Sequence, residues 1–496
     1  MVSGIEKTTL QSFWINIGKL LSGSALSQAI VFLTIPVITR FYSPDDFGIA
    51  AMFAVIVFSL EPISSLSYHQ AIMLCEKDTD ALNICALSFF IVTIFSLLLF
   101  IPFGLFNREI ASFFNAPLLE HFTWLIPIVV FSRAVYLILS FENSRRKNFS
   151  LQAFSTVVQT VTDKVIIIGA GFMGHATASA MIISRVIASF FETGVFASDI
   201  RALIKNRGVI SIPAIKKLAY KHRAFPLFAN WVALLSDGSA RLPIYMLAFF
   251  FSPEITGLYA MADRLIRTPM SLLGNSIRRV YYQAAANEKN NGVDLKVFFE
   301  SIRLRLLGYS LFPFLALMIM GEEIFTIILG SKWENVGTYI GILGILAVAQ
   351  FVSIPIASLV NVLGKQKSFL WLTLWLFLLK FFSLIAGGFI QDPIISVWFL
   401  VIAGILFYIY INFWIGGIIG IEKRETLMFF TKYIFLNMPF IGVLFLSRMF
   451  IPNLFYQAII FIITSTSYYL LVIYLIERVF LFTEFRAVFS RFFGRR

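Results

Sequence analysis

Charged residues lie inside stretches of the sequence that are otherwise apolar and long enough to cross a lipid bilayer. The clearest case is 252–283, which carries Asp263, Arg264 and Arg267. A charge near the centre of a bilayer costs about 3 kcal/mol on insertion scales, so such residues usually face a cavity or a partner. At about 100° per residue, Arg264 and Arg267 share a helical face that excludes Leu265. Arginine forks on such a face could bind phosphate oxygens.

Further charged residues lie at middle depth in other apolar stretches, as judged from a rise of about 1.5 Å per residue. The cations at this depth are Arg133, Lys164, Arg185, Arg241, Arg264, Arg267 and Lys380. The acids at or near it are Glu61, Asp163, Glu192, Asp237 and Asp263. Seven cations against five acids leave a modest positive excess. Because unpaired cations in lipid are costly, we expect ion pairs plus spare cations around a watery cavity, with an anion as the cargo.

A purely structural interpretation stands beside this one for each ion pair. Asp237 and Arg241 are four residues apart, a spacing that suits an intrahelical ion pair, and Asp163 is next to Lys164. For these pairs, a salt bridge that only holds helices together is at least as good an interpretation as substrate contact. For the arginine face of 252–283, which has one acid nearby, we favour a functional role.

The composition is that of a polytopic membrane protein and excludes a soluble globular chain. Of the 496 residues, 59% are hydrophobic and 14% are charged. Apolar windows of about 20 residues recur along the whole chain, which predicts an all-α protein with about 14 transmembrane helices. The predicted spans are 14–39, 47–68, 82–106, 121–141, 150–171, 175–198, 224–250, 254–283, 304–329, 335–363, 368–390, 394–420, 428–450 and 454–477.

The distribution of basic residues predicts the topology. The net charge is +13, and if the N-terminus is cytoplasmic most Lys and Arg fall in the cytoplasmic segments. This is the positive-inside pattern, which predicts that both termini are cytoplasmic. Much of the basic excess therefore has a topological cause, and we do not expect a nucleic-acid partner.

An internal repeat predicts two related halves. SPDDFGIAAMF at 43–53 aligns without gaps on SPEITGLYAMA at 252–262, with five identical positions of eleven. Six spans separate the two copies, so both run the same way through the bilayer, an arrangement found in transporters. The connection 199–223 is basic and less apolar than its flanks, and forms the best internal boundary. We predict two pseudo-symmetric six-helix lobes plus two extra helices: an N-terminal lobe at 1–203, a C-terminal lobe at 204–425, and a helix pair with a basic cytoplasmic tail at 426–496.

Two short motifs suggest enzymes, and their context argues against both. GAGFMG at 169–174 has the spacing of a dinucleotide fingerprint, but it separates two membrane-length apolar runs and is better explained as a tight turn. Asp78-Thr79-Asp80 lies in a short turn with no nucleotide-binding domain beside it. The four histidines are scattered and the two cysteines form no ligand set. We therefore expect no catalytic residues, no enzyme activity, no cofactor and no metal.

Three segments resemble a known family. ITRFYSPDDFGIAAMFAV after the first span, AIMLCEKDTDAL at 71–82 and ITGLYAMADRLIRTPMSLLGNSIRRVYYQAA at 255–285 are similar to bacterial polysaccharide repeat-unit flippases. These are Wzx-type members of the multidrug/oligosaccharidyl-lipid/polysaccharide (MOP) exporter superfamily. The second segment has Cys75 where the family pattern suggests a proline.

The resemblance implies a function, a location and partners. Such proteins move an undecaprenyl-diphosphate-linked oligosaccharide, an O-antigen or polysaccharide repeat unit, between leaflets of the bacterial inner (plasma) membrane by alternating access. The implied pathway is lipopolysaccharide assembly. The implied partners are membrane lipids and a polysaccharide polymerase or other assembly proteins.

The resemblance and the residues together assign roles to the charged side chains. Arg241, Arg264 and Arg267 are expected to contact the diphosphate, with Lys164, Arg185 and Arg133 helping. From position alone, Asp163, Asp237 and Glu61 are candidates for coupling to an ion gradient.

Three other functions compete with the flippase. A multidrug or cation exporter of the same superfamily would need an apolar or acidic pocket, which the cationic excess opposes. A membrane-bound polymerase or ligase generally needs a sizeable outer loop, and no connection here is long enough. A non-catalytic component of a glycan-assembly complex would tolerate neutralising all the cations at middle depth.

Overall fold

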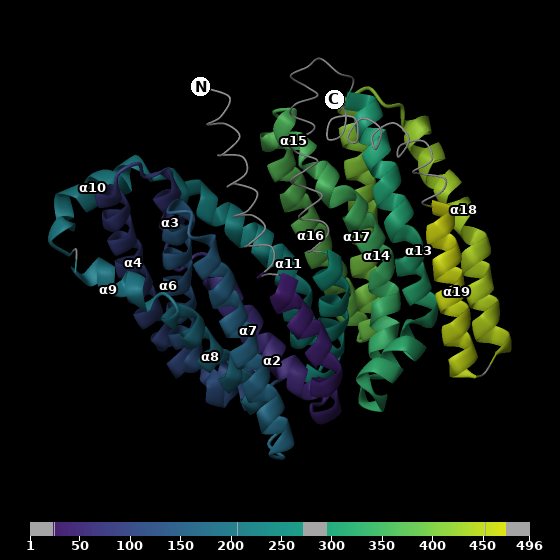
Figure 1. The fold of residues 1–496 in the computed structure, drawn as a ribbon, viewed down its shortest axis with the longest axis horizontal. Helices are drawn as coiled ribbons and strands as arrows, with labels where there is room; N and C mark the ends of the chain where they lie inside the picture. Colours follow the sequence, from purple (N-terminus) through teal and green to yellow (C-terminus); the bar gives the residue numbers. More distant parts are fainter. Residues whose placement is uncertain (1–22, 24, 206, 271–294, 452, 473–496) are drawn as a thin grey trace, which may run out of the picture. The chain divides into compact units, whose positions relative to one another are not determined.

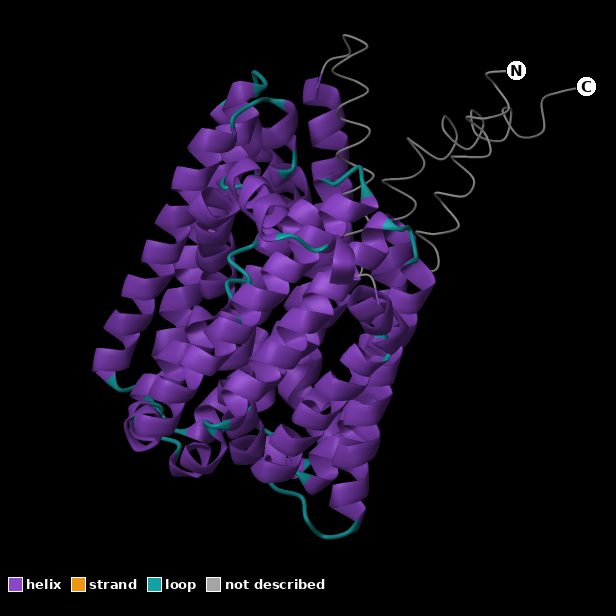
Figure 2. Cartoon of the chain, turned by 90° about the vertical axis from the view of Figure 1, so that its left-hand side faces the viewer, coloured by secondary structure: helices purple, strands orange, loops and turns teal. Residues whose placement is uncertain are grey.

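A computed structural model describes residues 23, 25–205, 207–270, 295–451 and 453–472. These residues form helices joined by short loops and turns, with no strand within those ranges (Figure 2). Contacts group the chain into two compact units, 1–260 and 261–496. The two units are therefore described separately, and the predicted boundaries at 203/204 and 425/426 stay predictions.

The first unit holds the helices that build the candidate site (Figure 1). Helix Ala25–Phe41 begins its described part and helix 253–270 enters it at residues 253–260. Between them lie α2 (Pro44–Leu60), α3 (Tyr68–Ala71), α4 (Asp78–Leu105), α5 (Asn107–Phe113), α6 (Leu125–Arg145), α7 (Phe149–Phe172), α8 (Ala178–Gly194), α9 (Ala197–Lys205), α10 (Ile212–Lys221) and α11 (Asn230–Phe250). Short helical turns η1 (Ile72–Leu74), η2 (Pro117–Phe122), η3 (Arg207–Val209) and η4 (Phe225–Ala229) connect some of them.

Local sequence fixes the start of α2 and ties it to α8. Ser43 is the N-cap, its hydroxyl accepts from the Asp46 N–H at 3.2 Å, and the Asp46 carboxylate accepts from the Ser43 N–H at 3.0 Å. This reciprocal pair is a capping box, and Pro44 at the first helical position suits the helix start. The second oxygen of Asp46 accepts from the Ala178 N–H at 2.7 Å, so one side chain orders the beginnings of two helices.

The two copies of the predicted repeat meet at their glycines. A Cβ on Gly48 would lie 1.8 Å from the Pro253 carbonyl oxygen, and a Cβ on Gly257 would lie 1.8 Å from the Pro44 carbonyl oxygen. Because Gly48 and Gly257 are aligned positions, the contact is reciprocal. Only a residue without a side chain lets the two backbones approach this closely.

The second unit holds the remaining helices. Its described residues begin with 261–270 and continue with α13 (Leu295–Leu329), α14 (Val336–Ala357), α15 (Leu359–Val362), α16 (Gln366–Ile390), α17 (Pro393–Ile418), α18 (Lys423–Phe450) and α19 (Leu454–Val472), with η5 at Ser331–Trp333. A glycine face on α14 packs on α13: a Cβ on Gly337 would lie 2.1 Å from the Glu322 Cα. In this unit α18 and α19 pack against each other and against α13 (Figure 1).

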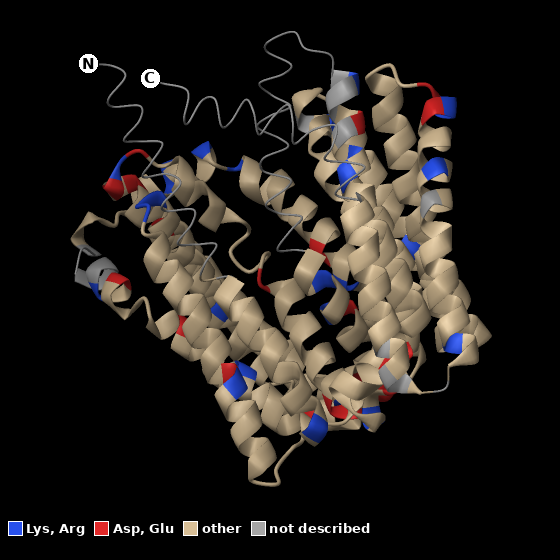
Figure 3. Ribbon diagram, turned by 45° about the vertical axis from the view of Figure 1, so that its right-hand side comes forward, with Lys and Arg blue, Asp and Glu red and all other residues tan. Residues whose placement is uncertain are grey.

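The predicted all-α membrane fold is confirmed. Each predicted apolar window contains a described helix, although residues 14–22, 24, 271–283 and 473–477 lie outside the described part of the chain. Within the described part, eight helices are long and apolar enough to cross a membrane. Figure 3 shows Lys, Arg, Asp and Glu mainly near helix ends, with long uncharged stretches between them. The connection 199–223, by contrast, is largely helical, since α9 and α10 occupy most of it.

Candidate functional site

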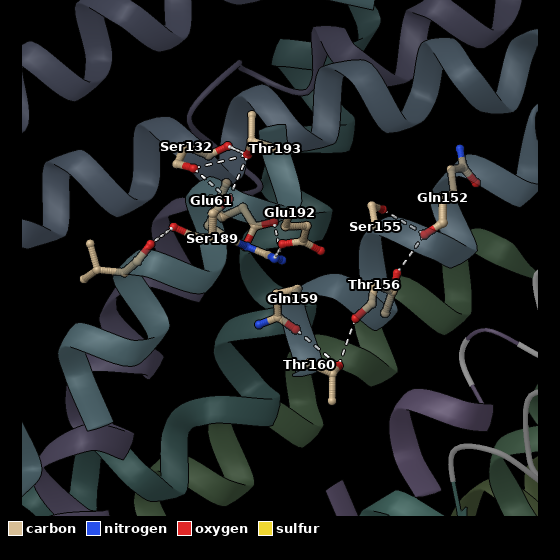
Figure 4. A network of polar contacts seen from close by, with 12 residues as sticks. Glu61, Ser132, Gln152, Ser155, Thr156, Gln159, Thr160, Ser189, Glu192 and Thr193 are labelled. Atoms are coloured by element: carbon tan, nitrogen blue, oxygen red, sulfur yellow. Dashed lines mark hydrogen bonds and ion pairs between the residues drawn. The ribbon is translucent and has the colours of Figure 1, made fainter. Parts of the chain in front are cut away.

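An arginine held by two glutamates forms the centre of the site in the first unit. The Arg133 guanidinium on α6 donates to both carboxylate oxygens of Glu61, at 3.2 Å and 3.1 Å, and to Glu192 on α8 at 2.5 Å. Glu61 follows the last residue of α2. Figure 4 shows Glu61 and Glu192 reaching toward one another from their separate helices. The two acidic side chains are 8% and 4% exposed, so the triad is a buried charge cluster that joins three helices.

Hydroxyl groups order the helices around this triad. The Ser132 hydroxyl donates to the Ser189 carbonyl oxygen at 3.0 Å, and the Thr193 hydroxyl donates to the Ser132 carbonyl oxygen at 3.0 Å (Figure 4). These bonds fix α6 against α8 next to Arg133 and Glu192. They satisfy backbone carbonyl groups between two apolar helices, where no water is at hand.

Three arginines surround one aromatic ring. The guanidinium carbons of Arg133, Arg185 and Arg241 lie 5.4, 5.7 and 5.1 Å from the centre of the Phe58 ring. Each separation falls within the range at which a cation is attracted to the ring quadrupole. One phenylalanine on α2 therefore helps to hold three like charges from α6, α8 and α11 in one neighbourhood.

A cavity of about 480 Å³ opens beside this cluster. Four of the predicted site residues, Glu61, Arg133, Asp237 and Arg241, line it. The remaining lining residues are Phe58, Pro62, His69, Gln70, Leu137 and Ala233. The cavity thus combines two arginines with two carboxylates, and its size would accommodate a diphosphate or a small cation.

Lys164 and Asp163 lie apart from that cavity's lining residues. The Lys164 ammonium donates to Asp163 at 2.7 Å, and the second Asp163 oxygen accepts from the Ser184 hydroxyl at 2.9 Å. Both charged residues are buried. Both charged residues belong to α7, and the Ser184 hydroxyl bonds their pair to α8, an arrangement that suits a structural role.

The other two predicted arginines lie in the second unit. Arg267 donates to Asp263, one turn earlier on helix 253–270, at 2.5 Å, and Arg264 is partly buried on the same helix. The Arg267 side chain is 41% exposed. The pairing with Asp263 agrees with the sequence spacing, and the structure leaves the proposed contact with a diphosphate as a prediction.

Charge is balanced among the residues at middle depth in the first unit. Its four cations, Arg133, Lys164, Arg185 and Arg241, are matched by four acids, Glu61, Asp163, Glu192 and Asp237. The positive excess inferred from the sequence therefore lies in the second unit, which has one acid at middle depth, Asp263, and three cations, Arg264, Arg267 and Lys380. An anion that enters the cavity of the first unit must compete with carboxylates for the arginines.

The structure adds two residues to the site that sequence reasoning did not assign to it. Glu192 was grouped with the acids at middle depth, and its spacing of seven from Arg185 placed both on one face of a helix, which was the available signal. Phe58 carried no signal, because one phenylalanine in an apolar helix does not differ from its neighbours. Among the described residues, no group of three or more His, Cys, Asp or Glu could hold a metal ion.

The sequence model of a family described as "Polysaccharide biosynthesis protein" matches residues 37–337. The succinoglycan biosynthesis transport protein ExoT of Rhizobium meliloti (strain 1021) is 20% identical over 352 residues, which cover 70% of this chain and 67% of that protein.

Two solved structures share the fold. One is the lipid II flippase MurJ in an inward closed conformation, with a TM-score of 0.71 and 15% identity over 92% of this chain and 99% of MurJ. The other is an inward-facing multidrug resistance MATE family transporter of the MOP superfamily, with a TM-score of 0.56 and 13% identity over 79% of this chain and 94% of that chain. The resemblance to MOP exporters noted in the sequence is confirmed, and the chain is a multi-pass membrane protein.

Proposed function

Since this chain belongs to the polysaccharide biosynthesis protein family, we propose that it is a flippase for undecaprenyl-diphosphate-linked oligosaccharide. It moves this lipid from the cytoplasmic to the periplasmic leaflet of the bacterial inner membrane by alternating access, with both termini cytoplasmic. The observation that carries the proposal is the cavity that Arg133 and Arg241 line. Such a cavity offers an anionic headgroup charge-assisted hydrogen bonds in a medium of low dielectric constant.

Within the cavity the arginines take different roles. Arg241 lines the cavity and, with Arg185, lies against Phe58. We assign the diphosphate oxygens to Arg241, because a planar guanidinium group fits phosphate with paired hydrogen bonds, and Arg185 helps from beside the same ring without lining the cavity. Arg133, held by Glu61 and Glu192, helps by keeping the two carboxylates in place.

Carboxylates in the same cavity suit the proposed coupling to an ion. Of the three acids named from position, Glu61 and Asp237 line the cavity. An arriving diphosphate adds negative charge to a balanced cluster, so uptake of a proton or cation by one of these acids would offset it. Asp163 is bonded to Lys164 and Ser184 and is the weakest of the three candidates. Membrane lipids and a polysaccharide polymerase are the partners that this role implies.

A complementation experiment tests the headgroup assignment. In a strain that lacks this gene, Arg241→Ala should abolish surface polysaccharide and cause lipid-linked repeat units to accumulate, while Arg241→Lys should keep part of the activity. Arg223→Ala is the matched control, because it removes an exposed arginine whose guanidinium carbon lies 4.2 Å from the centre of the Tyr220 ring. Full polysaccharide with Arg241→Ala at normal protein levels would contradict the proposal.

The arginines of the second unit need their own test. Replacing Arg264 and Arg267 together with Ala should also abolish surface polysaccharide. Replacing both with Lys keeps the positive charge and removes the planar guanidinium group, so it tells which of the two is needed. Undiminished polysaccharide in the double Ala variant would remove these two residues from the substrate path and leave the cavity of the first unit as the headgroup site.

One observation favours a second function, export of cationic drugs. Glu61 and Asp237 line the same cavity and could bind a cation. A deletion strain with increased sensitivity to cationic drugs and normal surface polysaccharide would support the exporter and contradict the flippase.

A further inference from the structure

A second cavity adjoins the arginine cavity in the first unit. Its volume is about 490 Å³, and Gln70 and Ala233 line both cavities. Apart from Gln70, its lining is apolar and includes Phe225, Phe228 and Val232. One cavity is thus charged, the other is apolar, and the two share a wall.

The start of α11 shapes the apolar cavity. The turn η4, Phe225–Ala229, is a π-helix that runs directly into α11. A π-helical turn holds more residues than an α-helical one, so it redirects the side chains before it relative to the helix that follows, and such turns are frequent at functional sites. Phe225 and Phe228 belong to this turn and line the cavity.

The turn before Gln70, a residue of the shared wall, has an unusual backbone. Leu66 and Ser67 both have positive φ, 49° and 59°, immediately before α3. The left-handed conformation is disfavoured for residues with a side chain, and it persists where the surrounding structure holds it. Ser67 is fully buried and donates a hydrogen bond to the Asn230 side chain at 3.3 Å, which fixes α3 and therefore Gln70 against the start of α11.

We propose that the apolar cavity binds the first isoprenoid units of the lipid whose diphosphate occupies the arginine cavity. This inference rests on the proposed function and adds a second binding site to it. The ligand is amphipathic, with an anionic head directly followed by an apolar chain. The charged cavity and the apolar cavity adjoin in the same order, so each part of the ligand has a matching cavity. Gln70 lies where head and chain join and can donate to a phosphate oxygen from its amide.

The apolar cavity positions the chain and contributes little affinity. Lipid tails are as apolar as the cavity wall, so moving an isoprenoid from bilayer to protein gains little free energy. Its effect is geometric: it sets the direction in which the chain leaves the headgroup. The test must therefore report where the chain lies, and a binding constant for the lipid would not do so.

Photo-crosslinking measures that position. The full chain is reconstituted in nanodiscs with geranylgeranyl diphosphate that carries a diazirine on its first isoprene unit. After irradiation, mass spectrometry should find the label on Phe228 or Val232, and excess inorganic diphosphate should lower it about tenfold. Arg241→Ala should lower it by a similar factor, about tenfold, which corresponds to losing about 1.4 kcal/mol of headgroup contact. The same diazirine on geranylgeraniol, which has no diphosphate, should label Leu227 as strongly as Phe228, because both side chains are exposed, at 57% and 69%, and only Phe228 lines the cavity.

Two tryptophan variants sharpen the result. Ala229 lines the apolar cavity and not the arginine cavity, so Ala229→Trp fills the apolar cavity and should remove the label while binding of radioactive inorganic diphosphate persists. Leu227→Trp, on the same turn and outside both linings, should leave the label in place.

The outcomes separate this inference from the proposed function. Diphosphate binding with label spread evenly over Leu227 and Phe228 would overturn the isoprenoid site alone. No binding of inorganic diphosphate by the unmodified protein would overturn the headgroup site, and this inference with it.

Discussion

Arg133 satisfies two carboxylates that come from different parts of the chain. Glu61 is 72 residues away in sequence and Glu192 is 59 residues away, yet all three side chains meet at one buried point. Both carboxylates are buried and depend on the same cation. Removing Arg133 would therefore break the ion pairs of both and destabilise the fold. Arg133 is therefore as much a structural residue as a member of the site.

Removing the shared cation should destabilise the protein strongly. We expect Arg133→Gln to lower the free energy of unfolding by about 3–5 kcal/mol, because it leaves two carboxylates buried without their cation. Thermal unfolding in detergent can be followed with a thiol-reactive dye, since Cys75 and Cys85 are both buried and react only as the fold opens.

A surface pair provides the comparison. Arg108→Gln breaks the ion pair with Glu120, in which the arginine side chain is 83% exposed, and should leave the melting temperature nearly unchanged. Adding Glu61→Gln and Glu192→Gln to Arg133→Gln should recover much of the loss. Equal melting temperatures for Arg133→Gln and Arg108→Gln would contradict the assignment.

Sequence reasoning found most of the charged residues of the site but could not pair those that lie on different helices. The cost of burying charge singles out Glu61, Arg133 and Arg241 from any membrane-length window. Their partners depend on which helices pack together, and a single sequence does not determine that packing. For the same reason the sequence indicated a positive excess without showing that the cations of the first unit are matched by acids.

Among the described glycines, Gly48 and Gly257 leave the least room for a Cβ beside a segment far away in the sequence. We expect Gly48→Ala to destabilise the protein by about 1–3 kcal/mol, the usual cost of forcing extra atoms into a packed contact. Gly257→Ala should act alike, and the two changes together should cost less than their sum because they disrupt one crossing. The same dye assay measures all three.

Gly104→Ala is the control for these variants. A Cβ on Gly104 of α4 would meet nothing within 4 Å, so the change should be neutral or slightly stabilising through helix propensity. A stable Gly48→Ala variant would show that the two backbones separate easily at this point. The alignment predicted that Gly48 and Gly257 are equivalent; that equivalent residues also touch is a property of the packed helices and has no sequence signal.

In the second unit an arginine joins α13 to α18. Arg303 is fully buried, and its guanidinium carbon lies 4.0 Å from the Phe429 ring centre and 5.2 Å from that of Phe299. We expect Arg303→Lys to weaken this contact, because an ammonium group cannot stack its plane on the ring. Hydrogen exchange should then accelerate in the first turns of α18, whereas Arg424→Lys on the exposed side of α18 should leave it unchanged. Unaltered exchange in Arg303→Lys would assign the contact no structural role.

At the scale of the whole molecule, hydropathy predicted the fold well. Every apolar window contains a described helix because, in a bilayer, the backbone can satisfy its hydrogen bonds only within a helix or a closed barrel. Windows of mean hydropathy could not predict short amphipathic helices such as α9 and α10. Their apolar residues occupy only one face, so the average over a window stays low. The predicted lobes at 1–203 and 204–425 describe a duplication in sequence, whereas contacts divide the chain after residue 260.

The positive-inside pattern gives the molecule a direction that cysteine labelling can test. The two native cysteines are buried, so a new exposed cysteine reports its own side of the membrane. Met173, 77% exposed in the turn between α7 and α8, is predicted to face the periplasm, and exposed Lys216 on α10 the cytoplasm. In spheroplasts, a membrane-impermeant maleimide should label Met173→Cys at once and Lys216→Cys only after permeabilisation. The reverse order would show that the basic α9–α10 segment lies on the outer side, against the positive-inside pattern. It would therefore contradict the proposed topology and the proposed direction of transport.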